Sequence, residues 1–217
     1  MIKRSNTLAL TMAILCAASN SIDAKDSGFD VPILDKLIAM KASMPSATNF
    51  QKVVAVNKFV NTEISYKSDA ADEWATPLQT MIRGYGDCED YALLKYSLLS
   101  DWGVPISSMR LTYGVIKHTR EAHMILVYDD PKESGVYVLD NRHNNVVRER
   151  VLSDFLAVYS FNHERFFLNE KGSVTDVAPT EINPTERLSK FETWAGNRLK
   201  IDAEPSIRAE STMRFKF

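Results

Sequence analysis

The chain has 217 residues, of which 45% are hydrophobic and 25% are charged, with 26 basic against 28 acidic side chains. This length allows one sizeable hydrophobic core and is short for two, so we expect a single globular domain. A net charge of −2 without a basic stripe argues against a general nucleic-acid binder.

Residues 1–24 have the pattern of a secretory signal peptide. Lys3 and Arg4 give a positive start, an apolar run follows over residues 8–18, and small and polar residues lead to Ala24. The apolar run is too short for a comfortable membrane span. We therefore expect export and cleavage near Ala24, with the bond itself left open.

The two cysteines indicate whether the mature chain is lipidated and whether it can form a disulfide. Leu15 stands before Cys16, where lipoprotein processing needs a small residue, so lipidation is not expected. Removal of the signal would leave Cys88 as the only cysteine of a single domain at residues 25–217, which does not span the membrane. A disulfide within that chain is impossible, and a lone thiol in an oxidising compartment must be buried or used.

Two amphipathic helices are predicted before the central stretch of the chain. Residues 31–44 carry apolar side chains at helical spacing and tolerate a proline in the first turn, and Pro45 ends the segment. A second helix is predicted over residues 49–64. Residues 66–73 read as a polar connection.

A cysteine lies among carboxylates in the stretch at residues 84–92. Two glycines allow a sharp turn, Asp87 is a good N-cap, and apolar residues at helical spacing follow as far as residue 99. Cys88 is therefore predicted in the first turn of a helix, where free backbone N–H groups favour a thiolate. Asp87, Glu89 and Asp90 oppose that effect. Without other signals, Cys88 would be a small buried residue and the acidic cluster an ordinary helix start.

Short segments rich in β-branched and aromatic residues follow the cysteine helix. Residues 110–116, 123–128 and 136–139 are separated by turn residues and predict three consecutive antiparallel strands. A fourth strand is predicted around residues 155–167, which are rich in aromatic residues.

The end of the chain has weaker patterns. Residues 169–180 resemble a linker. Asn183, Pro184 and Glu186 supply an N-cap, a first-turn proline and an acidic third residue, so an amphipathic helix is predicted at about residues 184–199.

Thiol catalysis needs a base and a third group that orients the base. His123 opens the second predicted strand and Asp140 ends the third. Taken singly, His123 could be an ordinary half-buried histidine and Asp140 an ordinary turn residue. Their order after Cys88 is that of papain-like and transglutaminase-like enzymes. We therefore expect an α+β fold in which the nucleophile helix packs on an antiparallel sheet. The other histidines are His118, His143 and His163.

Four short segments carry a closer resemblance. They are residues 74–77 (Trp-Ala-Thr-Pro), 86–92 (Gly-Asp-Cys-Glu-Asp-Tyr-Ala), 122–126 (Ala-His-Met-Ile-Leu) and 138–141 (Val-Leu-Asp-Asn). Together they resemble the bacterial transglutaminase-like cysteine peptidases, the periplasmic LapG-type proteases that clip large biofilm adhesins. The resemblance covers roughly residues 30–165, within an expected core at about 30–168. Gln79 departs from the glutamate expected in the family.

This resemblance implies catalytic roles for four residues. Cys88 would be the nucleophile, His123 the general base and then acid, and Asp140 the orienting carboxylate. The Cys88 backbone N–H, with Trp74 as a further candidate, would stabilise the oxyanion.

The resemblance also implies a cofactor and partners. Family members need Ca²⁺, which maps onto Asp87, Glu89 and Asp90, and carboxylate oxygens are the ligands that this ion prefers. A bound dication would offset the negative charge beside the thiol. The substrate would be the N-terminal retention region of a large adhesin, cut at small residues such as paired alanines. The regulator would be the periplasmic domain of an inner-membrane cyclic di-GMP receptor.

Other functions remain open on the sequence. A transglutaminase or a cell-wall amidase would carry the same three residues, because water and an amine differ only as acyl acceptors. An inactive binding module could keep the fold, although it would have no need of an activated thiol.

Overall fold

The computed structural model describes residues 32–69, 73–132, 135–170 and 173–177. The predicted signal peptide at residues 1–24 and the predicted helix at residues 184–199 lie outside this part of the chain. No helix within it is long and apolar enough to cross a membrane.

The α-helices of the described residues are α1 (Pro32–Ala42), α2 (Asn49–Glu63), α3 (Pro77–Arg83) and α4 (Cys88–Asp101). Helices α1, α2 and α4 confirm the predicted helices. Helix α3 was not predicted, although the sequence carries its signal. Thr76 and Gln79 form a capping box in which each side chain accepts the other's backbone N–H, at 3.2 and 2.9 Å. Pro77 occupies the first turn, and Gly84 ends the helix with a left-handed φ of 67°.

One antiparallel sheet follows α4, with strand order β6-β5-β4-β3-β7-β8-β9. Its strands are β3 (Met109–Ile116), β4 (Ala122–Asp130), β5 (Gly135–Leu139), β6 (Val147–Arg148), β7 (Phe155–Phe161), β8 (Phe166–Glu170) and β9 (Ser173–Val177). Two-residue strands β1 (Ser65–Tyr66) and β2 (Tyr85–Gly86) pair in parallel beside the helices. Short 3-10 helices are η2 (Ile106–Ser108) and η3 (Glu149–Val151). Strands β3, β4 and β5 confirm the three predicted consecutive strands.

Two predictions at the end of the sheet are wrong. The single strand expected at residues 155–167 is a hairpin, β7 and β8. Its turn forms because Asn162 Oδ1 accepts the backbone N–H groups of Glu164 and Arg165, at 2.9 and 2.8 Å. Residues 173–177 fall in the expected linker but form strand β9, whose backbone pairs with β8. Pairing supplied by a neighbouring strand is not visible in local composition.

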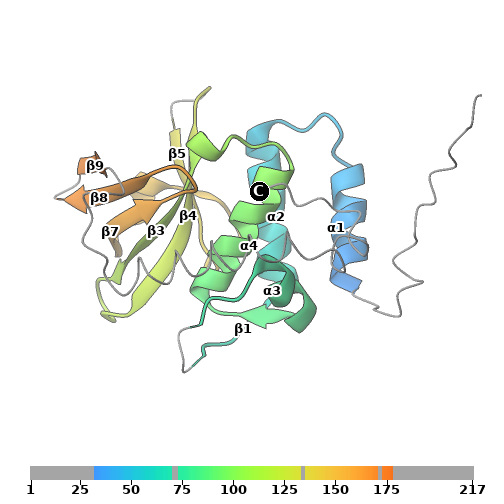
Figure 1. Ribbon diagram of the computed structural model, residues 1–217, viewed down its shortest axis with the longest axis horizontal. Coiled ribbons are helices and arrows are strands. Elements are labelled where there is room, and N and C mark those ends of the chain that lie inside the picture. Colours follow the sequence, from blue (N-terminus) through green and yellow to red (C-terminus); the bar gives the residue numbers. More distant parts are fainter. Residues whose placement is uncertain (1–31, 70–72, 133–134, 171–172, 178–217) are drawn as a thin grey trace, which may run out of the picture.

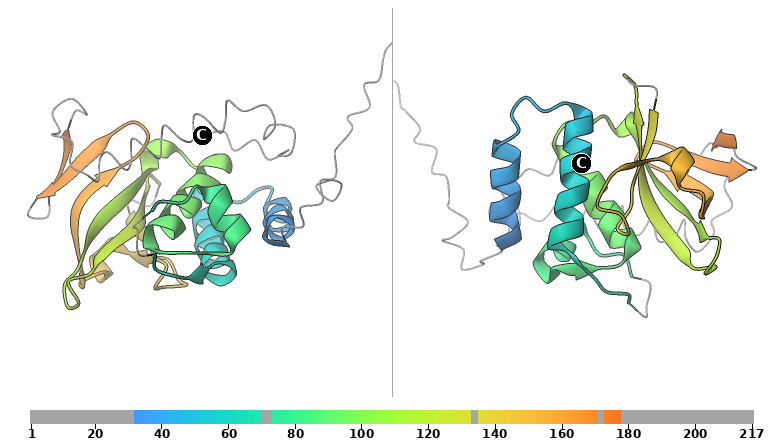
Figure 2. Two further views of the ribbon diagram at one scale, coloured as in Figure 1. Left: turned by 60° about the horizontal axis from the view of Figure 1, so that its bottom comes forward. Right: turned by 180° about the vertical axis from the view of Figure 1, so that it is seen from behind.

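Helix α4 lies between α2 and the sheet, with α1 on the outer side of α2 (Figures 1 and 2). Its residues from Glu89 to Leu99 are all buried, which suits a helix covered on every side. Leu93 and Leu99 share one core cluster with Leu111 and Leu126 of the sheet. This packing fixes α4 on the sheet and so fixes where its first residue, Cys88, stands relative to β4.

Candidate active site

The turn before α4 is shaped so that Cys88 becomes the first residue of the helix. Gly86 lies against Asp90, and a Cβ at Gly86 would stand only 2.6 Å from the Cβ of Asp90. Asp90 Oδ2 accepts the Asp87 N–H at 3.4 Å, while Oδ1 accepts the Ala75 N–H at 2.8 Å. The Asp90 carboxylate thus ties the start of α4 to the segment that precedes α3.

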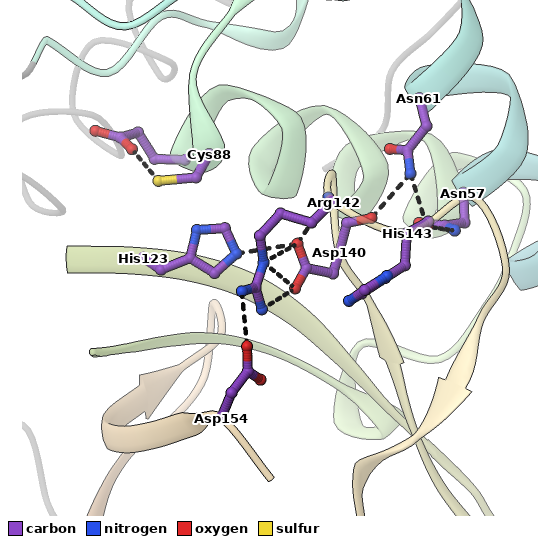
Figure 3. Close-up of polar contacts among 9 residues, drawn as sticks. Asn57, Asn61, Cys88, His123, Asp140, Arg142, His143 and Asp154 are labelled. Carbon is purple, nitrogen blue, oxygen red and sulfur yellow. Dashed lines mark hydrogen bonds and ion pairs between the residues drawn. The ribbon is translucent and has the colours of Figure 1, made fainter. Parts of the chain in front are cut away.

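The Cys88 thiol is half-buried and donates to Glu89 Oε2 at 2.9 Å (Figure 3). Burial is the main cause that raises the pKa of Cys88, followed by the charge and hydrogen bond of Glu89. The backbone N–H of Met124 acts in the opposite direction, and Asp87 adds a further increase in the pKa. This arrangement favours the protonated thiol, as the acidic neighbours in the sequence suggested.

His123, the second residue of β4, lies between a carboxylate and an aromatic ring. Its Nε2 is 3.0 Å from Asp140 Oδ1. The ring meets Phe155 edge-on at a centroid distance of 6.2 Å and an angle of 81°. Gly114, paired with His123, makes this possible, because a Cβ there would stand 2.4 Å from the Phe155 ring. Nδ1 is left on the side of the imidazole toward Cys88 (Figure 3).

Asp140 follows β5, is fully buried, and is held by Arg142 as well as by His123. Its carboxylate accepts three bonds of 3.0 Å or less from Arg142: from Nη2 at 2.7 Å, the backbone N–H at 2.9 Å and Nε at 3.0 Å. Arg142 Nη1 also donates to Asp154 at 3.1 Å. Burial alone would raise the pKa of Asp140, but the hydrogen bonds from His123 and Arg142 hold that pKa well below its usual range. Asp140 is therefore an acceptor, and His123 Nε2 carries the proton between them.

Helix α2 anchors the loop that follows β5. Asn61 Nδ2 donates to the Asp140 and His143 carbonyls at 2.8 and 2.9 Å. Asn57, one helical turn earlier, donates to the His143 and Asn144 carbonyls, both at 3.0 Å. Two amides spaced i, i+4 therefore hold the loop that presents Asp140 and Arg142 (Figure 3).

A cavity of about 240 Å³ lies where α4 and β4 begin. Trp74 stacks on Phe161 at 6.1 Å, and Tyr113 on Tyr159 at 5.1 Å, so aromatic rings form part of its wall. Asp140 contacts His123 and does not line the cavity. The lining residues are Tyr66, Ser68, Asp69, Trp74, Asp87, Cys88, Glu89, Tyr113, Ala122, His123, Met124 and Tyr159.

Comparison with known families bears on this arrangement. The model of the bacterial transglutaminase-like cysteine proteinases matches residues 37–164. The chain belongs to this family. It is a cysteine peptidase with the expected α+β, transglutaminase-like fold. Among curated proteins, none matches its sequence.

Solved structures of Legionella pneumophila LapG are similar to this peptidase. The EGTA-treated form has a TM-score of 0.66 at 25% identity, over 81% of this chain and 97% of that one. The calcium-bound form has a TM-score of 0.65 at 25% identity, over 81% of this chain and 94% of that one. The similarity therefore extends across almost the whole of that protein.

The predicted calcium ligands differ in their surroundings. Asp87 and Glu89 line the cavity. Asp90 is buried against the backbone, and burial raises its pKa to about 6. Within the described residues, no group of three or more His, Cys, Asp or Glu side chains is gathered to hold a metal ion. The chemistry of the donors nevertheless suits Ca²⁺, because Asp69 and Ser68 add oxygens to the same cavity wall.

Sequence reasoning missed three residues of this site, namely Arg142, Asn57 and Asn61. The signal for Arg142 is its place two residues after Asp140, at the end of a predicted strand. Asn57 and Asn61 stand one turn apart in a predicted helix, and Asn57 is fully buried. A buried amide needs a hydrogen-bond partner, but sequence alone does not name that partner.

Proposed function

We propose that this peptidase is a periplasmic, calcium-dependent endopeptidase that cleaves the N-terminal retention region of a large surface adhesin. The proposed catalytic residues are Cys88, His123 and Asp140. The hydrogen bond of 3.0 Å between His123 and Asp140, beside a cavity that Cys88 and His123 both line, carries the proposal. Family membership supports the reaction type, and similarity to LapG supports the choice of substrate.

The side chains suit acyl transfer through the sulfur. His123 takes the thiol proton as Cys88 Sγ attacks the scissile carbonyl, and Asp140 stabilises the resulting imidazolium. His123 then protonates the leaving amine, which departs and leaves an acyl-enzyme. Water attacks the acyl-enzyme with His123 as base, and a free carboxylate is released. The Cys88 N–H at the helix start is suited to stabilise the oxyanion, and Trp74 lines the same cavity.

Cleavage of a purified adhesin fragment tests this function. The wild-type chain should cut the fragment once, and mass spectrometry should find a free carboxylic acid at the new C-terminus. Prior alkylation with iodoacetamide should stop the cut, because Cys88 is the only cysteine besides Cys16. Cleavage that survives alkylation would contradict a thiol mechanism. An amide at the new C-terminus would indicate transfer to an amine.

Calcium removal should inactivate the enzyme. Asp87, Glu89 and Asp90 would hold Ca²⁺, which supplies positive charge beside a thiol whose pKa is raised by burial and by Glu89. We expect EGTA to abolish cleavage and Ca²⁺ to restore it. Mg²⁺ should fail, because it demands tighter octahedral geometry.

Calorimetry gives a readout that does not depend on cleavage. Ca²⁺ should raise the melting temperature of the wild-type chain, since any ligand specific to the folded state stabilises that state. Glu89→Gln should remove this shift, and the control Asp129→Asn, an exposed carboxylate toward the other end of β4, should keep it. Full activity in EGTA with no calcium-dependent shift would contradict the calcium site and leave the catalytic assignment standing.

A further inference from the structure

Strand β7 exposes two large apolar side chains close to the cavity. Leu156 is 54% exposed and Val158 is 40% exposed. Single exposed apolar residues are normal on protein surfaces. These two are informative because of what lies beside them in the sheet.

The strand register places Leu156 next to the cavity wall. Tyr159, Tyr113 and Met124 pair across β7, β3 and β4, and all three line the cavity. Two residues further along β3, Val115 pairs with Leu156 on one side and with Ala122 on the other. Paired residues share a face, and residues two apart along β3 or β4 share it too. On β7 the two rows stand three residues apart, because the pairing with β3 shifts by one residue between Tyr113 and Gly114. This second row therefore continues the cavity wall on the same face of the sheet.

Helix α4 covers this face only as far as its first residue. It begins at Cys88, and beyond that point the β3–β4 hairpin extends away from the helices (Figures 1 and 2). We call the surface left open the apolar shelf, made of Val115, Ala122, Leu156 and Val158. Ala122 belongs both to the shelf and to the cavity lining, so the two surfaces are continuous.

We propose that the apolar shelf binds the substrate polypeptide on one side of the scissile bond and selects an apolar side chain there. The inference rests on the proposed function, because the occupant is the polypeptide that Cys88 would cut. The two rows lie roughly 7 Å apart along the strand, which an extended polypeptide spans in two residues. The preferred apolar side chain should therefore stand two or three residues from the scissile bond.

The shelf offers no charged side chain to such a segment, so recognition there would depend on burial of apolar area. Burial of one leucine is worth a factor of roughly ten or more in affinity. A serine or aspartate at the same peptide position would forgo that gain.

Binding of fluorescent peptides to the Cys88→Ala variant tests the shelf without catalysis. The probes are twelve-residue peptides with a central Ala-Ala pair, carrying Leu, Ser or Asp two or three residues before or after that pair. We expect Leu on one side only to tighten binding about tenfold over Asp. Adding Leu156→Glu should remove this difference. The control Ile38→Glu, on α1 with a side chain 49% exposed, should keep it.

The outcomes separate the shelf from the proposed function. Equal affinity for all the peptides, or a preference that survives Leu156→Glu, would overturn the shelf. A preference that Leu156→Glu abolishes supports it. If the wild-type chain then fails to cut the peptide that binds best, the shelf stands as a polypeptide-binding surface while the endopeptidase proposal fails.

Discussion

Cys88→Ala and His123→Ala are each expected to lower kcat/KM for a cleavable adhesin fragment by roughly 10³-fold or more. Without the sulfur there is no acyl-enzyme. Without the imidazole, the thiol loses its proposed base, and the burial and acidic neighbours of Cys88 already disfavour the thiolate. Initial rates of fragment cleavage at several substrate concentrations measure both losses.

Asp140 should show a graded response. Asp140→Ala removes the group that holds His123 Nε2 at 3.0 Å. Asp140→Asn keeps an oxygen that accepts from Nε2–H, so it should retain more activity than the alanine variant. His118→Ala is the matched control, since His118 is exposed in the turn between β3 and β4. Wild-type rates for Cys88→Ala, or losses for His118→Ala equal to those for His123→Ala, would contradict the assignment.

The helix and strands that carry Cys88, His123 and Asp140 could be predicted because their signals are local. Turn glycines, an acidic N-cap and helical spacing identify the start of α4. Short β-branched segments between turns identify β3, β4 and β5. These elements place Cys88 at the start of a helix, His123 in a strand and Asp140 directly after the next strand. Helix α3 has an equally local signal, the capping box at Thr76 and Gln79, although the helix was not predicted from it.

The contacts that orient these residues could not be predicted in the same way. Arg142 reaches Asp140 and Asp154, which lie two and twelve residues away. Asn57 and Asn61 bind carbonyl groups roughly eighty residues further along the chain, and this is settled only when α2 packs beside the β5 loop. A glycine inside a strand ordinarily weakens it. At Gly114 the missing side chain leaves room for the Phe155 ring that packs against His123, and only the folded structure shows this. Tertiary packing decides each of these three features.

Arg142→Ala is expected to lower the free energy of unfolding at neutral pH by roughly 2–3 kcal/mol, because it leaves a buried carboxylate with fewer partners. This figure lies at or below the low end of the range for broken buried pairs, for two reasons. The Arg142 side chain is 29% exposed. Residue 142 also keeps its backbone N–H bond to Asp140 in the variant. Urea unfolding of the wild-type and variant chains measures the difference.

The control is Arg110→Ala, whose ion pair with Glu149 spans 3.8 Å and whose partner is half-exposed. That loss should stay below about 1 kcal/mol. The free energy of unfolding lost in Arg142→Lys should lie between the losses for Arg110→Ala and Arg142→Ala. An ammonium keeps the charge but cannot reproduce the bonds from Nε and Nη2.

The pH dependence identifies Asp140 as the group through which Arg142 acts. In the folded chain the pKa of Asp140 lies below its unfolded value, so its ionised form stabilises the fold at pH above that unfolded value of roughly 4. The stabilisation is lost as the pH falls toward the lower, folded pKa. Replacing Arg142 raises the folded pKa of Asp140, so the difference between wild type and Arg142→Ala should be full at pH 7. It should shrink as the pH falls through the folded pKa of Asp140 in the variant and on toward the lower wild-type value, because Asp140 then becomes protonated in the folded variant first. A difference that stays constant from pH 7 to pH 3 would mean that Arg142 stabilises the loop by packing alone.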